Sequence, residues 1–281
     1  MRLIYHSALL ILAALGCSSD QGVTATDVWE PFAGALADTQ RRNLTSEITG
    51  RTYQISVALP ENYAASNETY PVLYAVDANI QFGTVVETAR EQHQFGIVPE
   101  LIIVGIGYPV DRYAQSEELR VGDICGRGDR EGFLKFIRQE LIPLVELEFR
   151  AYSSERALYG HSCGGGFALH ALFEGEGTFE RVIAGSPGTR RILQLESTYA
   201  ESHDSLRAQL FISTGLLLDG PFPENPPGIK ELVAILEARD YAGLQIKTAY
   251  FEDETHITVI PATISRGLRA IYEGFPAAAS E

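Results

Sequence analysis

The sequence has few cysteines and few basic residues for its length. Only 3 of the 281 residues are Cys, and none lies in a C-x-x-C or Cys/His pattern, so neither a disulfide scaffold nor a structural zinc site is predicted. Lys and Arg number 22 against 37 Asp and Glu, a formal net charge of −15. We therefore expect no nucleic-acid partner. The same excess of acid disfavours anionic substrates.

Long hydrophobic runs are also missing, and the strongest apolar run lies at the N-terminus. Residues 8–15 (ALLILAAL) have the length of a signal-peptide core but are too few to span a bilayer. They lead into Ala-Leu-Gly-Cys17, which resembles the lipobox of bacterial lipoproteins. We predict a signal peptide over 1–16 and a lipid on Cys17, the protein's only membrane contact. The protein would then be periplasmic or associated with the outer membrane. Secretory cleavage nearby or an uncleaved apolar start are the alternatives.

The remaining composition is that of a folded protein. Hydrophobic residues make up 45% and aromatics 10% of the chain, which is enough for a packed core. Residues 17–43 are predicted to be a flexible tether and N-terminal extension, and 44–275 a single α/β domain. No oligomeric state follows from the sequence.

Apolar runs alternate with helix-like segments through this domain. A period-2 stretch over 52–59 indicates an antiparallel edge or second strand. Continuous apolar runs indicate buried parallel strands at 71–76, 101–106, 156–159, 181–184, 209–213 and 245–250. Helices are predicted over 132–149, 164–173, 228–239 and 260–272, with Pro143 kinking or splitting the first. The expected architecture is a mostly parallel sheet with helices on both faces.

A G-x-S-x-G motif marks the candidate nucleophile. Gly160, Ser162 and Gly164 follow a predicted strand and open a predicted helix, which is the strand–turn–helix setting that this motif requires. The glycines relieve the crowding of a sharp turn, and the serine hydroxyl projects above the sheet. The backbone N–H of Cys163, at the start of the helix, is a predicted oxyanion donor.

The serine needs a base, and His256 is the best candidate. It lies in a polar loop between the strand at 245–250 and the last helix, and ligands meet an open α/β sheet at such loops. The order Ser162 then His256 is that of an α/β-hydrolase. His161 directly precedes the nucleophile but is expected to point away from it.

The acid that orients the base is expected after the strand at 209–213. Asp219 is the first candidate, with Glu224 and Glu231 as alternatives. The second oxyanion donor is predicted in the loop after the strand at 71–76, where the backbone N–H groups of Ala78 and Asn79 are the candidates.

Two further features border this site. Arg120 could fix an anionic or phenolic group of a substrate, or form a loop ion pair. Cys125 and Cys163 could form a disulfide in an oxidising compartment, or Cys163 could be a small core residue.

Taken together, these motifs resemble the esterase D-like family of α/β-hydrolases, which includes siderophore trilactone esterases, feruloyl esterases and related acyltransferases. The resemblance covers about residues 45–272. It rests on the sequences VLYAVD (72–77), FLKFIRQELIP (133–143) and LYGHSCGGGFAL (158–169), on Arg120 and Asp123, and on His256 before the last helix. It implies an α/β-hydrolase fold with Ser162 as nucleophile and His256 as base. Leu218 stands where the family often has a Glu, so Asp219 could substitute, or a Ser–His dyad could suffice.

The sequence therefore predicts an exported serine hydrolase that cleaves small-molecule carboxylic esters through an acyl-enzyme. No metal or organic cofactor is required by this chemistry. An acyltransferase with the same residues and a non-catalytic ligand-binding lipoprotein are the alternatives. The loops around 108–128 and 186–206 are expected to shape the pocket, and they do not identify the ester.

Overall fold

The computed structural model describes residues 36–125, 128–218 and 226–275. All of them belong to one compact unit that begins at Ala35. The predicted signal peptide and Cys17 lie outside the described residues. Among the described residues, no helix is both long and apolar enough to cross a membrane.

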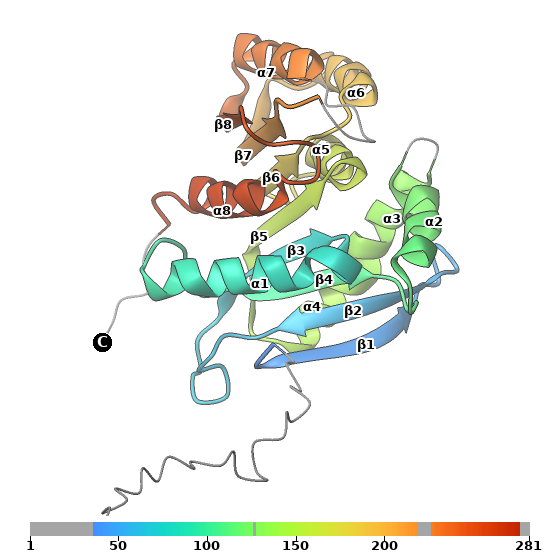
Figure 1. The fold of residues 1–281 in the computed structure, drawn as a ribbon, viewed down its shortest axis with the longest axis vertical. Coiled ribbons are helices and arrows are strands. Elements are labelled where there is room, and N and C mark those ends of the chain that lie inside the picture. Colours follow the sequence, from blue (N-terminus) through green and yellow to red (C-terminus); the bar gives the residue numbers. More distant parts are fainter. Residues whose placement is uncertain (1–35, 126–127, 219–225, 276–281) are drawn as a thin grey trace, which may run out of the picture. The chain divides into compact units, whose positions relative to one another are not determined.

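The described chain is organised around one eight-stranded sheet in the order β1-β2-β4-β3-β5-β6-β7-β8 (Figure 1). The neighbours from β4 to β8 are parallel, whereas β2 runs antiparallel to both β1 and β4. The strands are β1 (Thr39–Thr45), β2 (Thr52–Ala58), β3 (Tyr70–Val76), β4 (Ile102–Gly107), β5 (Ala151–His161), β6 (Arg181–Gly185), β7 (Ser205–Gly215) and β8 (Ala242–Phe251). Each predicted strand is present, and together with the helices they confirm the α/β-hydrolase architecture.

Helices cover both faces of the sheet, as predicted (Figure 1). Helices α1 (Ala78–Gln94) and α8 (Ile260–Ile271) contact each other on one face. The other face carries α3 (Arg130–Phe136), α4 (Ile142–Glu148), α5 (Cys163–Glu174), α6 (Arg190–Ala200) and α7 (Pro226–Arg239). Two separate apolar clusters result, one under each layer of helices. The sheet between them is buried on both faces, which explains why its strands have continuous apolar sequences.

The helix predicted over 132–149 is split, and Pro143 gives the physical reason. A π-helical turn, η1 (Ile137–Leu141), joins α3 to α4, and the Ile142 N–H donates to the Ile137 carbonyl five residues back. Pro143 has no N–H for the regular ladder, so the wider turn absorbs the break.

Three segments differ from the sequence-based expectation. Strand β1 begins at Thr39, within the segment 17–43 that was predicted as tether and extension. Helices α2 (Tyr113–Asp123) and α6 occupy much of the expected loops 108–128 and 186–206. Helix α2 consists mostly of polar residues. Helix α6 carries Ile192, Leu195 and Tyr199 at helical spacing, a signal that the prediction did not use.

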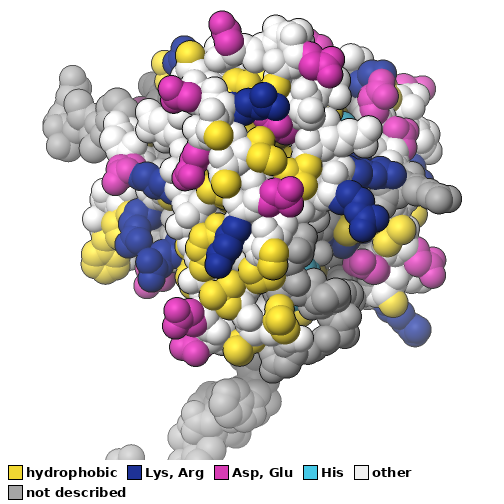
Figure 2. Space-filling view, turned by 90° about the horizontal axis from the view of Figure 1, so that it is seen from above, with side chains coloured by type: hydrophobic (Ala, Val, Ile, Leu, Met, Phe, Trp, Pro, Cys, Tyr) yellow, Lys and Arg dark blue, Asp and Glu magenta, His cyan; other side chains and the backbone are white. Residues whose placement is uncertain are grey.

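Charges of both signs are interspersed at the surface. Figure 2 shows arginine and lysine side chains among carboxylates on the face seen from above in Figure 1. Some parts of the surface therefore carry positive charge even though the net charge of the chain is −15.

Candidate active site

The Ser162 backbone forms the turn expected of a nucleophile. Ser162 directly follows β5 and caps α5, with φ 57° and ψ −117°. Its N–H donates to the Gly185 carbonyl at 2.8 Å, and its own carbonyl accepts from the Gly166 N–H at 2.9 Å. A positive φ at a residue with a side chain is strained, and such strain persists only where neighbouring contacts enforce it. These two bonds, to β6 and to α5, fix the turn.

The glycines of the motif are required by space. A Cβ at Gly160 would overlap the Gly164 carbonyl, and a Cβ at Gly164 would lie 2.7 Å from Val76 Cγ2 and 2.8 Å from Asp77 Oδ2. A Cβ at Gly165 would lie 2.5 Å from the Gly185 carbonyl oxygen. Helix α5 thus begins in direct contact with the ends of β3 and β6, which only glycine permits.

His256 lies beside the residue that precedes the nucleophile. Its side chain is buried, with 9% of the residue exposed, and its ring centroid is 4.8 Å from that of His161. The loop that carries it is tied to the end of β7, because Leu216 N donates to the Phe251 carbonyl and Leu217 N to the Glu254 carbonyl. The structure therefore brings the two residues Ser162 and His256 to the same edge of the sheet.

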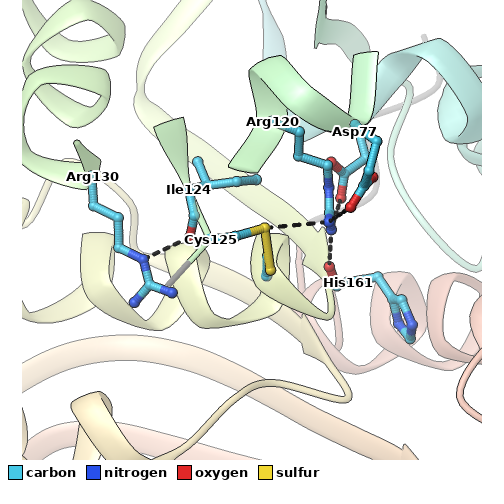
Figure 3. Close-up of a disulfide and its surroundings, with 8 residues drawn as sticks. Asp77, Arg120, Ile124, Cys125, Arg130 and His161 are labelled. Atoms are coloured by element: carbon cyan, nitrogen blue, oxygen red, sulfur yellow. Dashed lines mark hydrogen bonds and ion pairs between the residues drawn. A yellow bond between two sulfur atoms is a disulfide. The ribbon is translucent and has the colours of Figure 1, made fainter. Parts of the chain in front are cut away.

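His161 is a neighbour of the predicted base that sequence reasoning did not assign to the site. It is buried, and a Cβ at Gly185 would meet its Nδ1 at 2.8 Å, so the ring packs along β6. Figure 3 shows its side chain directed away from Asp77 and Arg120. The two-histidine contact arises from residues far apart in sequence, so no local pattern could have indicated it.

The predicted oxyanion donors lie at the first residues of two helices. Cys163 is the first residue of α5, and Ala78 and Asn79 are the first residues of α1. The Asn79 side chain is held by the backbone of Tyr108, donating to its carbonyl and accepting from its N–H, each at 2.8 Å. Both segments therefore present N-terminal backbone N–H groups, which favour negative charge.

Arg120 joins these two segments. Its Nε and Nη2 donate to the two carboxylate oxygens of Asp77 at 2.5 and 3.1 Å, and Nη2 also donates to the His161 carbonyl at 3.2 Å (Figure 3). Asp77 and Arg120 side chains are only 3% and 14% exposed. Burial raises the pKa of the Asp77 carboxyl, and the Arg120 guanidinium acts in the opposite direction. The predicted contact of Arg120 with substrate stays a prediction. In the structure, Arg120 on α2 joins Asp77, before α1, to His161, at the end of β5.

A disulfide reinforces the same junction. Cys125, just after α2, is bonded to Cys163, with 5.0 Å between their Cα atoms. The Arg120 Nη1 also lies 3.5 Å from Cys125 Sγ (Figure 3). Of the two possibilities left open for these cysteines, the structure contains the bridge.

Of the three candidates for the triad acid, the structure describes only Glu231. Asp219 and Glu224 lie outside the described residues, which end at Leu218 on this side of the gap. Glu231 is described and is exposed on α7. Within the described ranges, no group of three or more His, Cys, Asp or Glu residues could hold a metal ion.

Comparison with known proteins agrees with this geometry. The family model described as "Putative esterase" matches residues 46–210. The ferri-bacillibactin esterase BesA of Bacillus subtilis is 29% identical over 263 residues, covering 84% of this chain and 90% of the relative. The siderophore triacetylfusarinine C esterase of Aspergillus fumigatus is 31% identical over 272 residues, covering 81% and 91%. The crystal structure of the BES protein from Bacillus cereus superposes with a TM-score of 0.75 at 28% identity, covering 87% of this chain and 98% of that one.

Fold and site together define an α/β-hydrolase. Within that class, the chain belongs to the esterase family, and enzymatic ester hydrolysis is the chemistry that its relatives' names support.

Reduction of the disulfide should destabilise the fold. The bond closes a loop between residues 38 apart, and loop-closure entropy for that length corresponds to about 3–4 kcal/mol. We expect urea unfolding to give a free energy of unfolding lower by about this amount when the protein is reduced. The Cys125→Ser/Cys163→Ser double variant should be insensitive to reductant. Equal midpoints for the oxidised and reduced forms of the natural sequence would contradict the expectation.

Proposed function

We propose that the protein is an exported serine hydrolase that cleaves carboxylic esters through an acyl-enzyme on Ser162. The observation that carries the proposal is the positive φ of Ser162 at the junction of β5 and α5, with His256 packed against the preceding residue. Strained turns occur at active sites and also at ligand clamps. However, a histidine close to a serine in such a turn is the pairing that nucleophilic catalysis needs, so this geometry favours an enzyme over the non-catalytic alternative.

In the proposed reaction, His256 takes the proton of the Ser162 hydroxyl as its oxygen attacks the ester carbonyl carbon. The tetrahedral intermediate then expels the alcohol, which receives that proton, and the acyl group stays on Ser162 Oγ. Water then attacks the acyl carbon and gives its proton to His256. The bond between the acyl carbon and Ser162 Oγ breaks, Oγ takes the proton from His256, and the carboxylic acid leaves. An acyltransferase would differ only in the attacking hydroxyl.

The negative charge that develops on the carbonyl oxygen is proposed to be stabilised by hydrogen bonds from the backbone N–H groups of Cys163 and of Ala78 or Asn79. Both helix starts are fixed in place by the Asp77–Arg120 ion pair and by the disulfide. Donors that are already oriented stabilise a transition state without reorganisation.

The substrate is proposed to be a small-molecule ester of the siderophore class. Two relatives that match most of this chain are named for the hydrolysis of ferri-bacillibactin and triacetylfusarinine C. We further propose that the acid orienting His256 is Asp219, which lies two residues beyond Leu217, whose N–H is bonded to the His256 loop at Glu254.

Removal of the nucleophile tests the central proposal. Ser162→Ala should lower the kcat for 4-nitrophenyl butyrate by about 10⁴-fold or more, because the nucleophile and base act as a unit. A fluorophosphonate probe should label the natural sequence but not this variant. Ser197→Ala, an exposed serine on α6, serves as the control that retains both activities. Unchanged labelling of Ser162→Ala would exclude Ser162 as the nucleophile.

Replacement of the candidate acids tests which residue is the third member of the catalytic triad. Asp219→Asn should lower kcat by about 10⁴-fold if it orients the imidazole, whereas Glu231→Gln should leave the rate unchanged. Loss of rate in Glu224→Gln or Glu231→Gln instead would transfer the role. Full activity in all three variants would indicate a Ser–His dyad.

Export with a lipid anchor on Cys17 is proposed from the N-terminal motif, and the disulfide supports it because such bonds persist in oxidising compartments. We expect the protein expressed in a bacterium to fractionate with membranes and Cys17→Ser to be released from them. A membrane-bound Cys17→Ser variant or an unmodified Cys17 in the intact mass would argue against lipidation.

A further inference from the structure

A cavity beside helix α5 contains two arginines. It has a volume of about 620 Å³, and its lining includes Arg130 at the start of α3, Arg191 in the first turn of α6 and His170 on α5. Within the described part of the chain, neither arginine forms an ion pair with a carboxylate, although many other arginines of this acidic protein do. The cavity therefore contains two guanidinium groups that are not in contact with a carboxylate, although Asp129 and Glu131 also line it.

Arg130 is held in place by contacts that leave part of its guanidinium available. Its Nε donates to the Ile124 carbonyl at 2.7 Å, next to the disulfide (Figure 3). A Cβ added at Gly166 would lie 3.4 Å from its Nη2, so the guanidinium lies over the first turn of α5. Arg191 is exposed on the opposite wall. Burial lowers the pKa of Arg130, and the nearby charge of Arg191 lowers it further.

The two carboxylates at the same cavity are engaged elsewhere. Asp129 caps α3 by accepting from the Gly132 N–H at 2.9 Å. Glu131 accepts from Lys135 Nζ at 2.7 Å on the next turn of that helix. Each of the two carboxylates therefore accepts from a group other than the two arginines, and Lys135 offsets the charge of Glu131.

His170 supplies a polar atom without a partner. Its Nε2 is buried and has no hydrogen-bond partner among the residues that the structure describes, which is costly. Burial, with a smaller effect from Arg130, lowers the pKa of His170 to about 4. The ring is therefore neutral near pH 7 and adds no charge to the cavity.

We propose that this cavity binds an anionic oxygen group, such as a carboxylate, of the ester substrate. Guanidinium groups match the planar oxygens of a carboxylate. The link to the reaction is helix α5. Gly166 lies beneath Arg130 and donates to the Ser162 carbonyl, so the Arg130 end of the cavity is about one helical turn from the nucleophile. His170, the α5 residue that lines the cavity, is eight residues from Ser162, roughly 12 Å along the helix axis. This assignment rests on the proposed ester hydrolysis.

Two esters that differ only in a distal charge test the assignment. The 4-nitrophenyl monoester of adipic acid carries a carboxylate at the end of a six-carbon acyl chain, and 4-nitrophenyl hexanoate is neutral and of equal length. Arg191→Gln should lower kcat/KM for the adipate ester by about 10-fold, the effect of losing one charge-assisted hydrogen bond. Hydrolysis of the hexanoate ester should not change. Arg191→Lys should recover part of the loss.

Arg190→Gln is the matched control. Arg190 is exposed in the same turn of α6 and does not line the cavity, so this variant removes the same charge without removing the contact. Equal losses of kcat/KM for the adipate ester in Arg190→Gln and Arg191→Gln would indicate a long-range electrostatic effect and would contradict the proposed site. An unchanged adipate-to-hexanoate ratio in Arg191→Gln would also overturn it.

A binding measurement separates this proposal from the hydrolase proposal. Calorimetric titration of the Ser162→Ala variant with adipate should show saturable binding that Arg191→Gln abolishes. If neither ester is hydrolysed but this binding is observed, the hydrolase proposal fails and the anion site stands. If inorganic phosphate binds in an Arg191-dependent way while adipate does not, the cavity serves a separate anion and its assignment to substrate is wrong.

Discussion

The backbone turns at the carboxyl ends of three neighbouring strands set the positions of the candidate nucleophile and of the candidate oxyanion donors. Strands β3, β5 and β6 are adjacent in the sheet, and each is followed at once by a non-glycine residue with positive φ: Asp77, Ser162 and Ser186. Such conformations cost about 1–3 kcal/mol each. Hydrogen bonds to neighbouring strands hold the latter two, since Ser162 donates to Gly185 and Ser186 to Ser213. Because these bonds run sideways through the sheet, the strained turns are maintained by the central core.

Long-range links between these turns make them one rigid unit. Arg120 bonds both the Asp77 carboxylate and the His161 carbonyl, which precede the two sets of oxyanion donors. The Cys125–Cys163 bond attaches the end of α2 to the start of α5. The ion pair is buried, where breaking it would leave an uncompensated charge. The same helix, α2, therefore fixes both halves of the proposed oxyanion hole.

The sequence predicted the parts of this arrangement that have local signals. Continuous apolar runs marked the parallel strands, and Gly160, Ser162 and Gly164 marked the elbow, because steric needs at a tight turn are met by nearby residues. Helix α2 escaped prediction because its residues are mostly polar, and helix α6 because the helical spacing of Ile192, Leu195 and Tyr199 was not used. An ion pair was one of two possibilities for Arg120, but Asp77 could not be identified as its partner. The contact of His161 with His256 could not be predicted either, since each interaction joins residues brought together only by the folded sheet.

Net charge illustrates the limit of composition as a guide to substrate. A formal charge of −15 argues against anionic ligands only if charge is spread evenly, and screening confines each charge to about 8–10 Å at ordinary ionic strength. Within that range of the proposed anion site, Arg130 and Arg191 face one cavity, while Asp129 and Glu131 are bonded to a helix N–H and to Lys135. An anionic group entering there would experience the local pair of cations more strongly than the distant excess of carboxylates. The net negative charge of the whole chain then lowers the association rate of an anionic ester. The local arrangement of charges determines which ester binds beside Ser162.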